Sequence, residues 1–194
     1  MRIRVACEED AAAMARVMVD THLAAHRDQM PAAAWAKRAQ EWTYAVSERA
    51  WARALREIAA GASPQACIYV AEDGGDLVGL AMGGPVKTAD IPQTGEVYAL
   101  YVQASHQERG LGGRLLQVVA AHLAQRSMPA LQIGCLAANA PARRFYESLG
   151  GRVVGERLFD EAGVLLPEVV YGWTDTGTLV DMPRERLGKG STPR

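Results

Sequence analysis

The chain has 194 residues, a net charge of −1 and 49% hydrophobic residues, values that suit a single soluble globular domain. The near-neutral charge argues against nucleic acid or an acidic membrane as a partner, and no apolar run of about 18 residues predicts a membrane span. The N-terminus lacks the apolar core of a signal peptide and the three cysteines form no CxxC pair, so we expect a cytoplasmic protein without a disulfide framework or a zinc site.

The first half of the chain predicts a strand, a helical region and a hairpin. The predicted elements are a strand over 2–6, a helix over 8–26, a helical stretch over 31–61 and a β-hairpin over 65–85. Asp10 is the expected N-cap of the first helix. The helical stretch forms one helix, or two with a break near Ser47. Trp35 and Trp42 are expected to pack in the core, and lining a substrate pocket is the alternative. The sequence DGGD at 73–76 predicts the hairpin turn.

The second half of the chain alternates strands and helices and then closes with a hairpin. The predicted elements are a strand over 96–102, a helix from about 111 to 126, a strand over 130–136, a helix over 139–151 and a hairpin over 152–173. From Thr174 on the chain is polar, so we expect a domain over 1–174 and a polar, flexible C-terminal tail over 175–194. Hairpins mixed with crossover helices predict an α/β (α+β) fold around one sheet.

A glycine-rich segment, QERGLGGRLL at 107–116, lies between the 96–102 strand and the helix that follows it. Its glycines let the backbone approach a ligand closely, and the free N–H groups at a helix start attract anions. Two flanking arginines add positive charge, so the segment predicts a phosphate or pyrophosphate site. The residues concerned are Arg109, Gly110, Leu111, Gly112, Gly113 and Arg114.

Two nucleotide-binding motifs fit this segment poorly. A dinucleotide fingerprint needs a third glycine where Leu115 stands and an acidic residue about 20 positions later, and the sequence has neither. The GK pair of a P-loop occurs only at Gly188-Lys189, without a preceding strand. An ordinary glycine-rich helix start without a ligand stays open as the alternative.

Three segments together resemble the GCN5-related N-acetyltransferase (GNAT) superfamily. The first is QxxGxG at 107–112, which is similar to the family's acetyl-CoA signature. The second is Asn139 followed by ARRFYESLG at 142–150, and the third is the opening strand and helix. The resemblance covers about residues 3–173. It implies a single domain with a central mixed, mostly antiparallel sheet flanked by helices.

The resemblance implies how acetyl-CoA, as co-substrate, would be held. Backbone amides from Arg109 through Arg114 would bind the CoA pyrophosphate, and Gln107 belongs to the same signature. Leu100 and Val102 lie on the strand that would pair with the pantetheine arm, with the Val102 amide near the thioester oxygen. Asn139 would contact the same arm, and it can also cap its helix.

The resemblance also implies two catalytic residues. Tyr146 would protonate the departing thiolate, and Glu96 would act as the base, in some members through water. An amine attacks a thioester only when it is neutral, so the site needs an acceptor for its proton. The plain alternatives are a buried aromatic at position 146 and a solvated strand end at position 96. The fallback candidates for the base are Glu72, Asp73 and Tyr98.

Three further groups have plain structural explanations. Arg143 and Arg144 are expected to be solvated, and the functional alternative is that one of them pairs with a CoA phosphate. His22 and His26 are four residues apart on a helix, but no glutamate completes an HExxH motif, so we expect no metal site there. Cys135 is expected in the core and not as an acyl-carrying nucleophile.

The sequence therefore predicts an N-acetyltransferase in which a primary amine attacks acetyl-CoA directly, with no covalent enzyme intermediate and no metal. The acceptor, a small-molecule amine or a peptide amine, is expected at the helices of residues 11–60 and the loop at 84–95. Another acyl-CoA donor and a non-catalytic CoA-binding sensor or interaction module are the alternatives. A homodimer is expected only because it is the commonest closed assembly.

Overall fold

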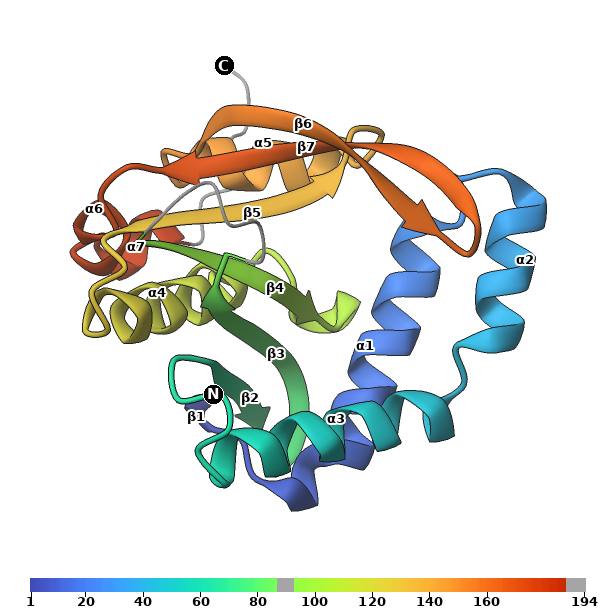
Figure 1. Ribbon diagram of the computed structural model, residues 1–194, viewed down its shortest axis with the longest axis horizontal. Coiled ribbons are helices and arrows are strands. Elements are labelled where there is room, and N and C mark those ends of the chain that lie inside the picture. Colours follow the sequence, from blue (N-terminus) through green and yellow to red (C-terminus); the bar gives the residue numbers. More distant parts are fainter. Residues whose placement is uncertain (87–92, 188–194) are drawn as a thin grey trace.

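The computed structural model describes residues 1–86 and 93–187. It forms one seven-stranded sheet in the order β1-β2-β3-β4-β5-β7-β6, in which β4 and β5 run parallel and the other neighbours run antiparallel (Figure 1). This mixed, mostly antiparallel sheet flanked by helices confirms the predicted fold class. The strands are β1 (Arg2–Val5), β2 (Cys67–Asp73), β3 (Asp76–Pro85), β4 (Thr94–Val102), β5 (Ala130–Leu136), β6 (Arg152–Glu161) and β7 (Val164–Trp173).

Helices cover both faces of the sheet. On one face, α1 buries Met14 and Val17 against Leu80 of β3. On the other face, α4 buries Leu115 and Val119 in a larger core with β4, β5 and β7 (Figure 1). The longer helices are α1 (Ala11–His26), α2 (Ala32–Glu41), α3 (Tyr44–Ala59), α4 (Leu111–Ala124) and α5 (Ala140–Ser148), and the 3₁₀ turns are η1 (Glu8–Asp10) and η2 (Ala104–His106). In the parts of the chain that the structure describes, no helix combines the length and apolar character that a bilayer crossing needs.

The predicted hairpin turn at 73–76 is confirmed. Gly74 and Gly75 both have positive φ, +62° and +97°, which is the backbone that a two-residue type I′ turn requires. The expected helix break near Ser47 is wrong, because that residue is buried within α3. The break lies at Thr43 instead, whose side chain accepts a hydrogen bond from the Val46 N–H at 3.3 Å and so caps α3.

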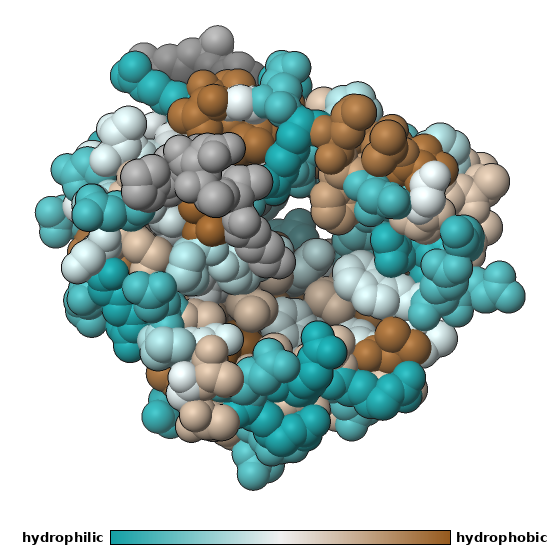
Figure 2. All heavy atoms as spheres, viewed as in Figure 1, coloured by the Kyte–Doolittle hydropathy of each residue, from teal (hydrophilic) through white to brown (hydrophobic). Residues whose placement is uncertain are grey.

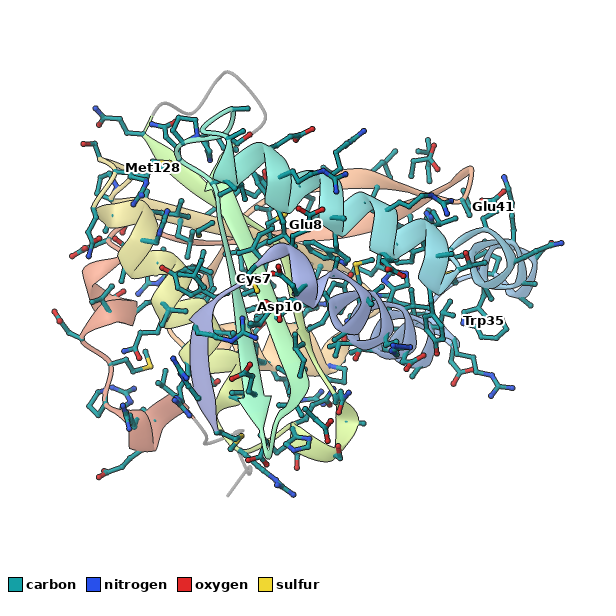
Figure 3. All side chains as sticks on the ribbon, turned by 90° about the horizontal axis from the view of Figure 1, so that it is seen from below. Cys7, Glu8, Asp10, Trp35, Glu41 and Met128 are labelled. Carbon is teal, nitrogen blue, oxygen red and sulfur yellow. The ribbon has the colours of Figure 1, made fainter. Side chains whose placement is uncertain are left out.

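The expected cap of α1 is also different in the structure. Asp10 makes no side-chain cap of that helix. Its carboxylate accepts a hydrogen bond from the Cys7 N–H at 2.8 Å and pairs with Arg4 at 2.7 Å, so it holds the chain where β1 passes into α1. Figure 3 shows Cys7 and Asp10 together at this point, far from Trp35 on α2.

The sequence predicts a flexible tail over 175–194, but the part of it that the structure describes is folded. Residues 175–187 contain two short helices, α6 (Gly177–Val180) and α7 (Arg184–Leu187), whose Leu179 and Leu187 are buried in the α4 core. The side chain of Gln117 on α4 explains their position, because it donates hydrogen bonds to the carbonyl oxygens of Leu179, Val180 and Met182 at 3.1, 2.7 and 3.1 Å. Propensity cannot predict such short helices, since a side chain from another element holds them.

Candidate functional site

The sheet splits between its two parallel strands. β4 and β5 pair only from Thr94↔Ala130 to Val97↔Ile133. Beyond that point β4 continues to Val102 on β3 alone, and β5 continues to Leu136 on β7 alone. The edge of β4 over 98–102 and the facing edge of β5 over 134–136 therefore carry backbone groups without a strand partner between them.

A β-bulge explains where the split begins. The β3–β4 register shifts so that Met82 faces Ala99 while Gly83 faces Val97, which leaves Tyr98 as the extra residue on β4. A bulge bends its strand and often occurs beside a functional site. The bend at Tyr98 follows directly after the last β4–β5 pair, so it turns β4 away from β5. Figure 2 shows the surface hollowed in the region that Figure 1 places between β4, α1 and the β6–β7 hairpin.

The glycine-rich turn lies beyond the end of β4 and begins α4. Gly110 has φ +77°, a left-handed conformation that favours glycine. The first intrahelical hydrogen bond runs from the Arg114 N–H to the Gly110 carbonyl at 3.0 Å, and no side chain caps the helix. The N–H groups of residues 111–113 therefore have no intrahelical acceptor and can bind an anion.

The other residues of the predicted signature position this turn. The Gln107 side chain donates a hydrogen bond to the Val102 carbonyl at 2.8 Å and so fixes the turn to the end of β4. Gly112 and Gly113 have packing roles, because a Cβ on them would lie 3.2 Å from the Phe145 ring and 3.0 Å from Leu187. The expectation that these glycines also let the backbone approach a ligand closely stays a prediction.

The start of α5 lies at the β5 end of the split. Asn139 caps the helix, since its Oδ1 accepts a hydrogen bond from the Ala142 N–H at 3.1 Å. Arg143 donates to the Tyr171 hydroxyl at 3.2 Å and to the Ala137 carbonyl at 3.3 Å. The structure thus gives both side chains intramolecular roles, and contact of either with CoA stays a prediction.

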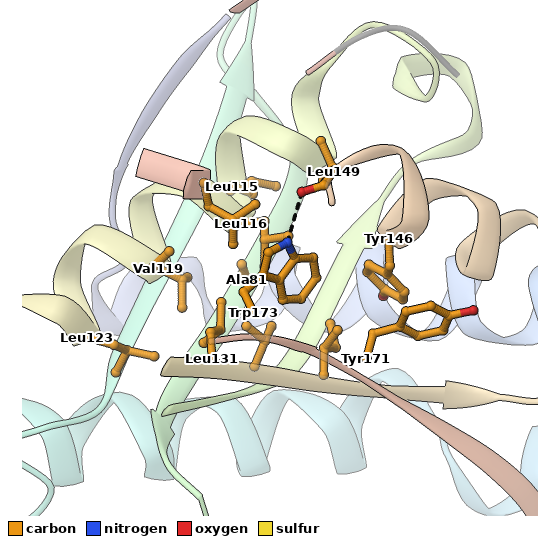
Figure 4. Close-up of a cluster of buried hydrophobic side chains, with 14 of the residues drawn as sticks. Ala81, Leu115, Leu116, Val119, Leu123, Leu131, Tyr146, Leu149, Tyr171 and Trp173 are labelled. Atoms are coloured by element: carbon orange, nitrogen blue, oxygen red, sulfur yellow. Dashed lines mark hydrogen bonds between the residues drawn. The ribbon is translucent and has the colours of Figure 1, made fainter. Parts of the chain in front are cut away.

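Tyr146 comes from α5 and is buried among aromatic rings. Its ring centroid lies 5.6 Å from that of Tyr171 and 6.4 Å from that of Trp173, whose Nε1 donates to the Leu149 carbonyl at 2.9 Å (Figure 4). Burial raises the pKa of the Tyr146 hydroxyl well above its ordinary value, with smaller contributions from Cys135 and then Tyr101. These two neighbours lie on β5 and β4, the strands on either side of the split, and the high pKa keeps the phenol protonated at neutral pH.

Glu96 lies on β4 two residues before the bulge and is only 5% exposed. Its carboxylate accepts a hydrogen bond from Arg157 of β6 at 3.0 Å. Arg157 also pairs with Glu168 of β7, which is buried. The sequence interpretation missed Arg157 and Glu168, because only the strand order β4-β5-β7-β6 brings them to Glu96.

The three fallback candidates for the base differ from Glu96 in their positions or contacts. Glu72 pairs with Arg4 at 2.6 Å, and Asp73 lies 3.3 Å from His106. Both lie at the end of the sheet where β4 finishes, whereas Glu96 pairs in register with Gly84 near the other end. Tyr98 donates a hydrogen bond to the Pro85 carbonyl, and burial, with a smaller contribution from Glu96, raises its pKa to about 12.

A second polar cluster closes the opposite side of the hollow. Arg38 of α2 pairs with the buried Glu161 at the end of β6, and His22 of α1 lies 3.7 Å from the same carboxylate. Burial acts to raise the pKa of Glu161, but its interactions with His22 and Arg38 outweigh burial and lower that pKa. Tyr101 lies 3.4 Å from the His22 Nδ1, and Trp42 packs edge-on to the His22 ring at 4.7 Å. These contacts attach the β6–β7 hairpin to the helices predicted to face the acceptor.

Three residues singled out in the sequence have mainly structural contacts. The rings of His22 and His26 stack at 4.3 Å, and no group of three or more metal-ligating side chains occurs within residues 1–86 and 93–187. Cys135 is buried on β5, where burial raises its pKa to about 11 and so favours the unreactive thiol.

Of the predicted acceptor loop at 84–95, residues 87–92 lie outside the described residues.

Comparison with known proteins identifies this arrangement. The domain family described as "Acetyltransferase (GNAT) family" matches residues 27–151, which is more than half of the chain. The chain belongs to the GNAT acetyltransferase family. The split between two parallel strands and the glycine turn before α4 both lie within the matched region.

Relatives of this GNAT chain include a curated protein and solved structures. The uncharacterized N-acetyltransferase YuaI of Bacillus subtilis is 34% identical over 113 residues, which cover 58% of this chain and 65% of that protein. The match therefore spans less than two thirds of this relative. PaiA N-acetyltransferase from Thermoplasma acidophilum, in complex with coenzyme A, superposes with a TM-score of 0.66 at 15% identity over 88% of this chain and 96% of that chain. The putative acetyltransferase YncA from Salmonella typhimurium, with its cofactor acetyl-CoA, superposes with a TM-score of 0.64 at 23% identity over 90% of this chain and 94% of that chain.

Proposed function

We propose that this GNAT chain transfers an acetyl group from acetyl-CoA to a primary amine by direct attack. One observation carries the proposal: the three free N–H groups of residues 111–113 stand beyond the end of β4, beside the open split. A diphosphate bound by these groups leaves its pantetheine arm free to enter the split. The complexes of PaiA with coenzyme A and of YncA with acetyl-CoA support the same ligand class.

Unpaired backbone groups on β4 can hold the extended arm. Leu100 and Val102 lie on the part of β4 that has no β5 partner, so their N–H and carbonyl groups can pair with the amides of pantetheine. The Val102 N–H is proposed to stabilise the oxyanion that forms as the amine attacks the thioester. Tyr146 is proposed to donate its proton to the departing sulfur, because it packs in the same core as Val102 of β4 and Cys135 of β5.

The acceptor amine is proposed to approach from the hollow between β4, α1 and the β6–β7 hairpin. Glu96 borders this side and can take the proton that an ammonium must lose before it attacks. The cluster of His22, Arg38 and Glu161 holds the hairpin over the same hollow. A cytoplasmic location and a homodimer stay predictions from the sequence.

A ligand and amine screen tests the proposal. Acetyl-CoA at about 100 times its Kd should stabilise the protein by about 2.7 kcal/mol and raise Tm by roughly 5–10 °C, whereas NAD and ATP should not. Members of a panel of primary amines should then accelerate thiol release from acetyl-CoA. Stabilisation by ATP but not by acetyl-CoA would overturn the proposal. Acetyl-CoA binding without amine-dependent release would favour the CoA-binding sensor, and faster release from propionyl- or succinyl-CoA would favour another donor.

A further inference from the structure

We propose that Glu96, Glu168 and Gln132 form a subsite that holds the acceptor as an ammonium cation, and that Arg157 neutralises only one of the two carboxylates. The inference rests on the proposed acetyl transfer and names the substrate class: amines that arrive protonated, with one cationic nitrogen seated at the mouth of the split. Three observations carry it, namely a buried charge imbalance, an unpartnered amide and the position of both beside the bulge.

The charge imbalance follows from the ion pairs. Arg157 Nη2 lies 3.0 Å from Glu96 Oε1, and Arg157 Nε pairs with Glu168. The Glu96 and Glu168 side chains are 7% and 9% exposed, while that of Arg157 is 40% exposed. Among the described residues, no second cation makes an ion pair with either carboxylate. Two buried negative charges therefore share one positive charge, and a buried unpaired charge is costly. One further monovalent cation would balance the cluster.

An unpartnered amide provides the second observation. Gln132 on β5 is only 6% exposed, and its side chain makes no hydrogen bond with any residue of the described ranges. It pairs in register with Glu96, and its neighbours Leu131 and Ile133 point into the α4 core, so Gln132 lies on the same face as Glu96. The Gln132 amide atoms are not among the solvent-sealed polar atoms that lack a partner, so they keep contact with solvent and can bind a ligand that enters from it.

Gly134 makes room for the subsite. A Cβ at this position would lie 2.5 Å from the Glu168 carboxyl group, so only glycine lets that carboxylate lie over β5. Acceptors from β4, β5 and β7 then lie on one face: the carboxylates of Glu96 and Glu168 and the amide oxygen of Gln132. An ammonium group carries three N–H donors, which matches these three acceptors.

The position links the subsite to the reaction. Glu96 and Gln132 belong to the next-to-last pair before the split, and Gly134 is the first β5 residue beyond it. A nitrogen held here passes one proton to a carboxylate and then forms its bond to the thioester carbon. The C–S bond breaks with its electrons on sulfur, which takes a proton from Tyr146, and the second nitrogen proton restores the phenol. The carboxylate proton leaves to water, so protons and electrons balance.

Binding of n-butylamine, with n-butanol as its uncharged analogue, tests the subsite. The Kd should be measured by NMR titration at pH 7, both without CoA and with CoA bound. Glu168→Gln brings the cluster to neutrality and should weaken n-butylamine binding by about tenfold or more, whereas Arg157→Gln leaves two carboxylates and should tighten it several-fold. Glu156→Gln is the control, because it makes the same charge change on an exposed side chain directly before Arg157 on β6. It should leave the Kd unchanged.

The test is decisive because Glu168→Gln and Arg157→Gln are expected to change the Kd for n-butylamine in opposite directions. Both substitutions break the same ion pair, so a purely structural role would move amine binding in one direction in both variants, and that result would overturn the subsite. An equal effect of Glu156→Gln, or equal changes with n-butanol, would also overturn it. If Glu168→Gln does not fold, the sign of the Arg157→Gln effect still decides. Acetyl-CoA binding is measured separately, so its absence in the wild type refutes the acetyl-transfer proposal while the CoA-free titrations still test the cation subsite.

Discussion

Replacing Tyr146 with phenylalanine is expected to lower kcat by on the order of 10²–10⁴-fold while the KM for acetyl-CoA changes little. The substitution removes only the hydroxyl group, and the ring keeps its contacts with Phe145, Tyr171 and Trp173. Burial keeps the hydroxyl protonated, and Tyr146 packs in the same core as Val102 of β4 and Cys135 of β5, so it can donate a proton to sulfur. Steady-state kinetics with an amine identified in the screen would measure the change.

Tyr171→Phe is the matched control for this prediction. It removes a hydroxyl from a ring whose centroid lies 5.6 Å from that of Tyr146, but this hydroxyl bonds to Glu147 at 2.6 Å on the helix surface. We expect its kcat to stay within a few-fold of the wild type. Full activity in Tyr146→Phe would mean that the phenol is not the acid, and an equal loss in both variants would point to packing.

Replacing Gly110 with valine is expected to weaken acetyl-CoA binding by on the order of 10²-fold. A β-branched residue resists the left-handed conformation at φ +77°, with a cost of about 1–2 kcal/mol. Relaxation of that strain would turn the N–H groups of residues 111–113 away from a bound diphosphate. Each hydrogen bond to a charged group contributes about 1.5–3 kcal/mol, so the loss of one or two accounts for the change. Isothermal titration with acetyl-CoA would measure it.

Gly61 offers a control with the same backbone strain. It has φ +73° and lies after α3, and no atom lies within 4 Å of the position that a Cβ would take there. Gly61→Val should therefore lower Tm about as much as Gly110→Val and leave acetyl-CoA affinity unchanged. If both variants lose affinity equally, general destabilisation explains the loss, and the turn at 110 has no special part in binding.

The features that the sequence could predict depend on short-range signals. The DGGD turn needs two residues with positive φ, and both its glycines adopt it. The glycine turn before α4 and the Asn139 cap of α5 also lie within a few residues of the elements that they begin. In each case the residue type and the local backbone suffice, and the strand order has no influence.

The features that escaped prediction depend on contacts between distant segments. Arg157 and Glu168 lie on the closing hairpin, and nothing in their local sequence indicates that they reach Glu96 across β5. The bulge at Tyr98 is visible only in the register between β3 and β4. Gln117 fixes the described part of the C-terminal segment from 62 to 65 positions away. Neither hydrophobic periodicity nor turn composition reports such pairs.

The glycine turn is proposed to bind the diphosphate of CoA and so to direct the thioester into the split between β4 and β5. A crystal structure with acetyl-CoA tests this most directly. We predict the diphosphate against the N–H groups of residues 111–113, with the pantetheine arm along 98–102. A complex with no ligand at that turn, or with acetyl-CoA bound on another face of the sheet, would show that the turn does not hold the diphosphate.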